Sequence, residues 1–480
     1  MLQTKKTPVS ATPAGAVGED ARETVVSMYQ AQKKIYARAV SGWFAGWRWA
    51  LVWATQLVFY GLPWLEWNAR QAVLFDLGAR RFYIFGLVLY PQDFIYLTGL
   101  LIVAAYSLFL FTAVAGRLWC GYACPQTVYT EIFMWVERKL EGDRAQRMRL
   151  DAAPWGVDKL LRKGGKQLAW ITIGLWTGFT FVGYFTPIRS LAAAASTLGF
   201  GPWEWFWICF YGLATYGNAG WMREQVCKYM CPYARFQSVM FDADTLIITY
   251  DAARGEPRGP RSKKADPAAA GLGHCVDCGI CVQVCPTGID IRRGLQYECI
   301  GCAACIDGCN QVMDRMRYPR GLIRYSTDNA LRGRYAETTF LRHMMRPRTL
   351  VYGAVLLAVV AALSFTLAVR VPLKVNVIRD RAALSREAAD GRIENVYRLQ
   401  VMNTEEAPRR YVVSVSGIPG AELGLRQPLE VPAATTQTFP VEVRADPAAL
   451  RAGSHPIVFH VEAVHDARVQ RDEKSTFILR

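Results

Sequence analysis

Several common functional motifs are missing from this 480-residue chain, and each absence narrows what the protein can be. No C-x-x-C-H occurs, which argues against covalent haem attachment of the c type. No G-x-G-x-x-G follows an expected strand, so no nucleotide donor is indicated and the electron donor stays unidentified. The first forty residues have no apolar core, so we expect no cleavable signal peptide. Residues 373–480 contain no cysteine, so no disulfide can stabilise this end of the chain.

Apolar residues, in contrast, are abundant: they make up 52% of the chain, with 15 Trp and 22 Phe. A helix needs about 20 mostly apolar residues to cross a bilayer. Five stretches approach this length: 44–66, 92–115, 166–185, 202–219 and 348–371. The fourth stretch is the weakest candidate for a span, because its glycines and polar atoms would also suit a half-inserted helix. We therefore predict a multi-domain membrane protein with an α-helical transmembrane bundle of about five spans.

The distribution of Lys and Arg predicts the orientation of this bundle. Segments 116–166 and 221–347 contain ten and eighteen basic residues, whereas segments 68–83 and 186–201 contain three and one. The positive-inside rule then places the N-terminus and the long segment before the fifth span in the cytoplasm, and the fifth span exports the C-terminal domain. The net charge of +16 is thus mostly a topology signal. Since no basic stripe is interleaved with aromatic residues, we expect no nucleic-acid partner.

Cysteine spacing gives the strongest functional signal. Eight of the 13 cysteines lie within residues 275–309, in two runs of the form C-x-x-C-x-x-C-x-x-x-C. This is the spacing of a bacterial ferredoxin with two 4Fe-4S clusters, in which the fourth cysteine of each run binds the cluster of the other run. We therefore predict one cluster on Cys275, Cys278, Cys281 and Cys309, and the other on Cys299, Cys302, Cys305 and Cys285.

Zinc is the main alternative occupant of these runs. Two C-x-x-C pairs suffice for a structural zinc site, which leaves the third and fourth cysteines of each run unexplained. Disulfides fit less well still, because the cytoplasm is reducing. The second run departs from the first in one respect: Asn310 follows Cys309, where Pro286 follows Cys285. The missing proline removes no ligand.

Two further cysteine motifs follow apolar stretches. CGYACP begins at Cys120 and CKYMCP begins at Cys227, and both repeat the C-x-x-x-C-P spacing that ends the first ferredoxin run. Both lie on the cytoplasmic side of the predicted bundle, so their thiols can converge beneath the ferredoxin domain. Such a thiolate-rich pocket suits Cu(I) or an additional iron–sulfur cluster, whereas buried thiols without a ligand are the simpler alternative. The group comprises Cys120, Cys124, Cys227 and Cys231, and we interpret Cys209 as a packing residue.

Together, the stretches RLWCGYACPQTVYTEIF and CKYMCPYARFQSVMFD, the twin ferredoxin runs and the β-rich tail resemble the CcoG/FixG/RdxA family of cytochrome c oxidase accessory proteins. The resemblance covers nearly the whole chain from residue 40. It implies a bacterial inner-membrane protein that reduces Cu(II) to Cu(I) for the copper centre of cbb3-type oxidase, with oxidase assembly factors or copper chaperones as partners. Copper is then the expected substrate or ligand, beside two 4Fe-4S clusters. The resemblance does not identify the residues that bind copper.

Two alternatives of other functional classes remain open at the level of sequence. One is a polyferredoxin-type subunit that carries electrons from quinol to a partner protein without binding copper. The other is a redox-sensing assembly scaffold whose clusters report oxygen.

The C-terminal tail has the pattern of a β-sandwich. Apolar and polar residues alternate in short segments such as 397–403 and 409–417, with Pro, Gly and Asp between them. This pattern predicts an immunoglobulin-like fold. The expected organisation is an N-terminal cytoplasmic segment (1–40), four transmembrane helices (41–235), a cytoplasmic ferredoxin-like domain (236–347), a fifth transmembrane helix (348–371) and a periplasmic immunoglobulin-like domain (372–480).

Overall fold

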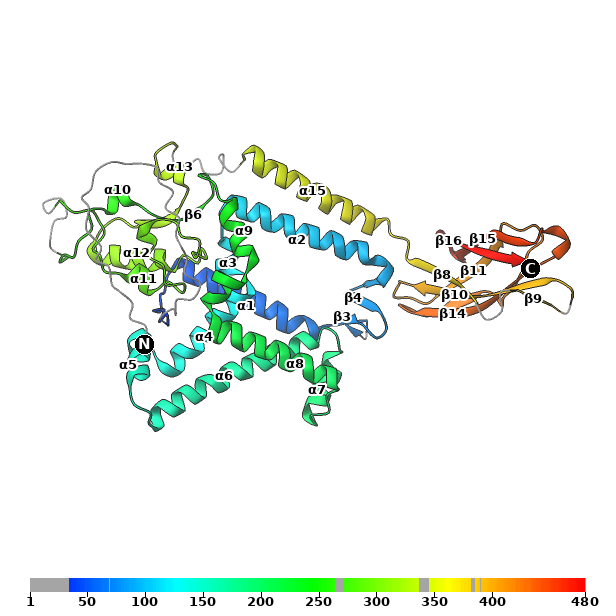
Figure 1. Ribbon diagram of the computed structural model, residues 1–480, viewed down its shortest axis with the longest axis horizontal. Helices are drawn as coiled ribbons and strands as arrows, with labels where there is room; N and C mark the ends of the chain where they lie inside the picture. The colour runs from blue at the N-terminus through cyan, green and yellow to red at the C-terminus, as the bar shows by residue number, and fades with distance from the viewer. Residues whose placement is uncertain are drawn as a thin grey trace, which may run out of the picture. The chain divides into compact units, whose positions relative to one another are not determined.

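The computed structural model describes residues 34–480, except 69, 264–270, 336–344, 381–384, 389 and 480. Most of the predicted N-terminal segment 1–40 therefore lies outside the described residues. From Tyr36 onward the chain forms a helical part, a cysteine-rich part, one further long helix and a β-rich part, in that order (Figure 1).

The helical part contains both long and short helices. They are α1 (Trp43–Gly61), α2 (Phe94–Ala115), α3 (Leu118–Tyr122), α4 (Pro125–Glu141), α5 (Arg144–Ala152), α6 (Val157–Val182), α7 (Ile188–Ser196), α8 (Pro202–Thr215) and α9 (Pro232–Met240). Two π-helices, η3 (Tyr216–Met222) and η4 (Val226–Met230), lie between α8 and α9. A three-stranded antiparallel sheet precedes α2 and consists of β3 (Val73–Asp76), β4 (Arg81–Ile84) and β5 (Leu87–Leu89).

Two of the described helices are long and apolar enough to cross a membrane, judged by length and composition: Pro91–Ala115 and Pro347–Ala368. The second is α15, and the two helices run side by side (Figure 1). The Tyr96 hydroxyl donates a hydrogen bond of 3.2 Å to the carbonyl of Thr366, and a Cβ on Gly99 would lie 2.7 Å from the Leu363 side chain. They coincide with the second and fifth of the five predicted spans.

The other three predicted spans coincide with helices that do not meet this criterion. The stretch 44–66 forms α1, which ends at Gly61 before a short 3-10 turn containing Pro63. The stretch 166–185 is only the apolar part of α6, whose first ten residues include Lys159, Arg162 and Lys163. In the stretch 202–219 the α-helix is shorter than the predicted span, because α8 ends at Thr215 and the π-helix η3 follows.

The cysteine-rich part has an internal repeat. Strands β6 (Ile247–Tyr250) and β7 (Ile323–Ser326) pair antiparallel at its two ends, and helices α11 (Ile280–Gln283) and α12 (Ala304–Met316) lie between them. Each of these helices follows a residue with left-handed backbone, Gly279 at φ 66° and Ala303 at φ 57°. These residues occupy equivalent places in the two cysteine runs, so both runs turn in the same way.

The C-terminal part is a sandwich of two antiparallel sheets, as the alternating pattern predicts. One sheet has the order β12-β14-β10-β8, with β9 also paired to β10, and the other has the order β13-β11-β15-β16. Tyr397, Tyr411, Phe459 and Phe477 are fully buried in the core between them. The strands are β8 (Leu373–Arg379), β9 (Arg386–Glu387), β10 (Ile393–Asn403), β11 (Arg409–Ser416), β12 (Glu422–Gly424), β13 (Leu429–Val431), β14 (Thr436–Ala445), β15 (Gly453–Ala463) and β16 (Asp466–Leu479).

Candidate redox site

The structure gathers the first predicted set of four cysteines around one cavity. Cys275, Cys278, Cys281 and Cys309 all line a space of about 330 Å³ beneath β7. Burial raises the pKa of the Cys309 thiol to about 12, and the other three thiols of the set each add to this rise. Since all four thiols line the same cavity, the fourth cysteine of the second run lies with the first three of the first run.

The second predicted set is gathered in the same way. Cys285, Cys299, Cys302 and Cys305 line another space of about 330 Å³. Burial raises the pKa of Cys305 well above its ordinary value, with further increases from Cys299, Cys302 and Cys285 and a smaller one from Cys281 of the first set. Cys281 lines both cavities, which makes them direct neighbours.

The chemistry of these thiols fits an iron–sulfur group. Thiolates are the ligands of such clusters, yet burial raises the pKa of Cys299 to about 12 and that of Cys281 to about 11, against an ordinary value of 9.0. In the bare protein these thiols are therefore neutral at physiological pH. A cationic iron core supplies the charge that several buried thiolates need in order to lie together.

The CGYACP and CKYMCP motifs are built alike. Cys124 is the N-cap of α4 and Cys231 is the N-cap of α9, both with extended backbone, and each helix begins with the proline that follows its cysteine. Proline suits this first helical position because its missing N–H has no partner there anyway. The C-P pair therefore starts a helix in each case and holds the thiol at the helix entrance.

The structure brings all four of these cysteines together. Burial raises the pKa of Cys120 to about 12, with contributions from Cys124 and Cys227. Burial likewise raises the pKa of Cys124, and Cys231 adds to the rise. The Cys120 thiol also donates to the Gln237 side-chain carbonyl at 3.3 Å. Among the residues that the structure describes, no three His, Cys, Asp or Glu side chains are placed so that they could hold a metal ion, in this group or in the two ferredoxin sets.

The four-cysteine group packs directly against the second ferredoxin set. Cys120 and Cys227 contact the apolar cluster that contains Cys302, and Cys305 packs against the same cluster. The two backbones approach closely at Gly121, where a Cβ would lie 2.7 Å from the carbonyl oxygen of Gly301 and 2.8 Å from the Cα and N of Cys302. Only glycine allows the two backbones to lie this close.

Replacing Gly121 by Ala is expected to force these backbones apart. Overpacking of this kind typically destabilises a protein by about 1–3 kcal/mol, and here it displaces the loop that carries Cys302. Gly46→Ala is the matched control, since a Cβ at Gly46 in α1 meets nothing within 4 Å. The control should stabilise the helix by about 0.5–1 kcal/mol. Thermal unfolding together with iron content measures both effects, and equal behaviour of the two variants would refute the close approach.

Helix α1 is fixed to the ferredoxin part by two buried contacts that sequence patterns gave no sign of. The Arg48 side chain donates to the carbonyl of Cys302 at 2.8 Å. Asp307 of α12 accepts from the backbone N–H of Ala45 at 2.7 Å and of Phe44 at 3.3 Å, so it caps the N-terminus of α1. Both contacts link residues more than 250 positions apart, and nothing local in the chain marks them.

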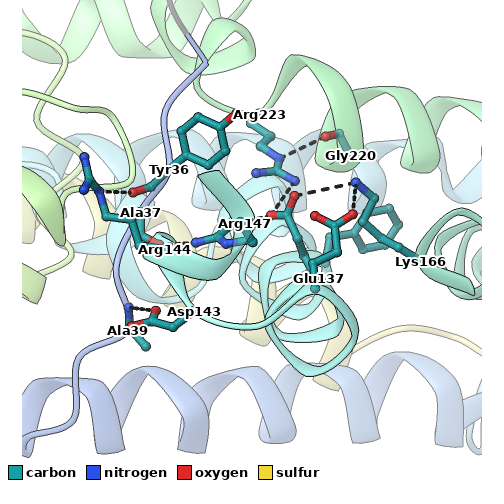
Figure 2. Close-up of polar contacts among 12 residues, drawn as sticks. Tyr36, Ala37, Ala39, Glu137, Asp143, Arg144, Arg147, Lys166, Gly220 and Arg223 are labelled. Atoms are coloured by element: carbon teal, nitrogen blue, oxygen red, sulfur yellow. Dashed lines mark hydrogen bonds and ion pairs between the residues drawn. The ribbon is translucent and has the colours of Figure 1, made fainter. Parts of the chain in front are cut away.

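A buried network of charges, also missed by sequence reasoning, supports the same region (Figure 2). The fully buried Glu137 of α4 accepts from Arg147 at 2.8 Å and from Arg223 at 3.1 Å. Lys166 of α6 lies 2.8 Å from Glu141 and 3.7 Å from Glu137. The network joins α4, α5, α6 and Arg223 at the end of η3, and thereby fixes α4, the helix that starts at Cys124.

The extended segment 36–40 is attached to this network (Figure 2). Arg144 donates to the carbonyl of Tyr36 at 3.0 Å, and Arg147 donates to the carbonyl of Ala37. On its other side, the N–H of Arg38 donates to the carbonyl of Gln283 in α11 at 2.8 Å. The segment therefore bridges α5 and the ferredoxin part.

Comparison with known proteins agrees with this architecture. A family description of a 4Fe-4S dicluster domain matches residues 222–328, one of a 4Fe-4S binding domain matches residues 97–142, and one of the Ig-like fold at the C-terminus of FixG matches residues 363–480. The nitrogen fixation protein FixG of Rhizobium meliloti is 40% identical over 454 residues, covering 88% of this chain and 87% of that protein. The chain belongs to the FixG family. The resemblance predicted from the cysteine motifs is thereby confirmed.

Two further proteins are similar to this FixG-family chain. The protein RdxA of Cereibacter sphaeroides is 38% identical, over 86% of this chain and 88% of that protein. The ferredoxin-type protein NapH of Haemophilus influenzae is 26% identical, over 44% of this chain and 66% of that protein. The chain is thus an iron–sulfur electron-transfer protein with 4Fe-4S ferredoxin domains and an immunoglobulin-like C-terminal domain.

Proposed function

We propose that this FixG-family chain is a membrane-bound cupric reductase that supplies Cu(I) for the copper centre of a cbb3-type oxidase. The observation that carries the proposal is the direct packing of the four-cysteine group against the second ferredoxin set at Gly121. When bound, ferredoxin-type clusters supply electrons at potentials down to about −400 mV or lower, well below the Cu(II)/Cu(I) couple in ordinary ligands. Thiolates favour Cu(I), so the neighbouring group suits the reduced ion.

The proposed cluster ligands follow the two gathered sets. Cys275, Cys278, Cys281 and Cys309 would hold one 4Fe-4S cluster, and Cys285, Cys299, Cys302 and Cys305 would hold the other. The cavity linings support this crossed arrangement, since Cys309 lines the cavity of the first three cysteines of the first run and Cys285 lines that of the second run. Cys120, Cys124, Cys227 and Cys231 would receive copper.

We place the chain in the bacterial inner membrane as a multi-pass protein. The two long apolar helices, α2 and α15, support membrane insertion, and α1, α6 and α8 would complete the predicted bundle of about five spans. The alternation of basic segments puts the ferredoxin domain in the cytoplasm and the immunoglobulin-like domain in the periplasm. Oxidase assembly factors or copper chaperones would be its partners.

One observation favours a second candidate function, an electron-transfer subunit between quinol and a partner protein. The 4Fe-4S binding description matches residues 97–142, which include Cys120 and Cys124, and the relative NapH is named a ferredoxin-type protein. In that case the four-cysteine group would hold a third cluster in place of copper.

Metal analysis of the anaerobically purified protein separates the two candidates. For the copper role we expect about eight iron atoms per chain and tight binding of added Cu(I). The double variant Cys120→Ser/Cys231→Ser should lose the copper and keep the iron. Cys209→Ser is the control, since that cysteine lies apart from the others on α8. About twelve iron atoms, of which the double variant loses four, would favour a third cluster and contradict copper binding.

A further inference from the structure

A cavity that is partly open to solvent lies where the segment 37–40, helix α4 and the ferredoxin loops meet. Cys227 of the four-cysteine group and Cys302 of the second ferredoxin set both line it. Thr287 of the loop after Cys285 lines it as well. A molecule inside would therefore touch the proposed copper site and the proposed electron source together.

The wall of this cavity is strongly basic. It contains five arginines and two carboxylates, an excess of three positive charges: Arg38, Arg48, Arg138, Arg147 and Arg223 against Glu131 and Glu224. Glu137 does not line the cavity, but its carboxylate pairs with two of these arginines, Arg147 and Arg223.

Three guanidinium groups keep unused capacity for hydrogen bonds. Arg48 is buried, and its Nε has no hydrogen-bond partner within the described residues. For the Arg38 and Arg138 side chains, the same described part of the chain offers no ion-pair or hydrogen-bond partner either. Guanidinium groups bind carboxylates through paired, charge-assisted hydrogen bonds. The cavity thus has the lining of an anion-binding site.

A bare Cu(II) ion does not suit such a wall, because two positive charges would enter a site that is already positive. A Cu(II) ion held in an excess of carboxylates carries a net negative charge and is attracted. We propose that the cavity admits copper as an anionic carboxylate chelate, with Arg38 and Arg138 binding the outer carboxylates. This inference rests on the proposed function and names the form in which its substrate arrives.

The chemistry balances without a further reactant. One electron from the reduced protein converts Cu(II) to Cu(I), and no bond within the chelator breaks. Carboxylates hold Cu(I) weakly whereas thiolates hold it well, so the ion passes to Cys227 at the wall. The bond from copper to the Cys227 sulfur forms as the thiol proton passes to water, the bonds from copper to the carboxylates break, and the chelator leaves unchanged.

The test uses the full-length protein with its clusters, in detergent, and two probes. Citrate alone, without copper, is titrated calorimetrically to measure anion binding. Cu(II) citrate, an anion, and Cu(II) tris(2-aminoethyl)amine, a dication, are then compared as substrates of the pre-reduced protein. The test variant is Arg38→Gln/Arg138→Gln. The control variant Lys139→Gln/Arg149→Gln also removes two positive charges, but from exposed residues that do not line the cavity.

In the test variant we expect citrate binding and the reduction of Cu(II) citrate to weaken by about tenfold or more, with reduction of the dicationic complex unchanged or faster. The control variant and the iron content of both should match wild type. Equal citrate binding by wild type and test variant would overturn the inference alone. If citrate binds as expected but neither complex yields Cu(I), the proposed copper reduction is contradicted. The cavity would then be an anion site that does not serve to admit copper.

Discussion

Replacing Cys305 by Ser is expected to remove one of the two 4Fe-4S clusters and to abolish copper reduction. Cys305 has three thiol neighbours of its own set. It also packs against the group of buried apolar residues that Cys120 and Cys227 contact. Changes to groups around a metal's ligands typically cost about 10–100-fold in metal affinity or activity, so the loss of a ligand should cost at least ~100-fold. Iron should fall from about eight to about four atoms per chain.

Iron analysis, electron paramagnetic resonance of the reduced protein and the rate of Cu(I) formation measure these effects. Cys209→Ser makes the same chemical change outside all three cysteine groups. It should leave the iron content, the resonance signal and the rate of Cu(I) formation unchanged. If Cys305→Ser keeps full iron and full activity, Cys305 is not a cluster ligand. If it loses the cluster but reduces copper at the wild-type rate, electrons reach copper by another route.

Replacing Glu137 by Ala is expected to destabilise the protein by about 3–5 kcal/mol, the usual cost of removing one partner from a buried ion pair. Glu137 is fully buried and lies within 3.1 Å of both Arg147 and Arg223, with Lys166 nearby (Figure 2). Its loss leaves three cations without their shared carboxylate in a region of low dielectric. The four elements that the network joins should then separate early in unfolding.

Denaturant unfolding in detergent measures this loss. Asp158→Ala is the control, because Asp158 and Arg162 form an exposed pair on α6 at 2.8 Å. Such surface pairs contribute about 0–1 kcal/mol, so the control should unfold close to wild type. Comparable losses in the two variants would mean that the Glu137 network contributes no more than an ordinary surface pair.

The sequence allowed much of the candidate site to be predicted, because its signal is local spacing. Each ferredoxin run has its cysteines within eleven residues, and the turns between them are set by short-range backbone geometry such as the left-handed Gly279 and Ala303. The period-two pattern of the tail likewise follows from burial on one face of each strand, and it predicted the β-sandwich correctly.

What sequence patterns could not reveal are contacts between distant segments. In the sequence, Gly121 resembles any small residue in an apolar stretch. Only the structure shows that a Cβ at this position would lie 2.8 Å from the backbone of Cys302. Glu137 and Arg223 are 86 positions apart, and their charges read as ordinary surface residues. The extent of the helices was also hidden: α8 ends four residues before the predicted span does, because a π-helix begins at Tyr216.

Anaerobic stopped-flow absorbance tests the proposed copper reduction most directly. The protein is reduced with dithionite, freed of excess reductant, and mixed with Cu(II) citrate and a Cu(I)-specific chelator. We predict that reoxidation of the clusters and formation of Cu(I) follow the same time course, at about one Cu(I) per cluster since each cluster gives up one electron. In Cys305→Ser, formation of Cu(I) should be abolished. Clusters that stay reduced while copper remains Cu(II) would contradict the proposal and leave quinone as the redox partner to examine.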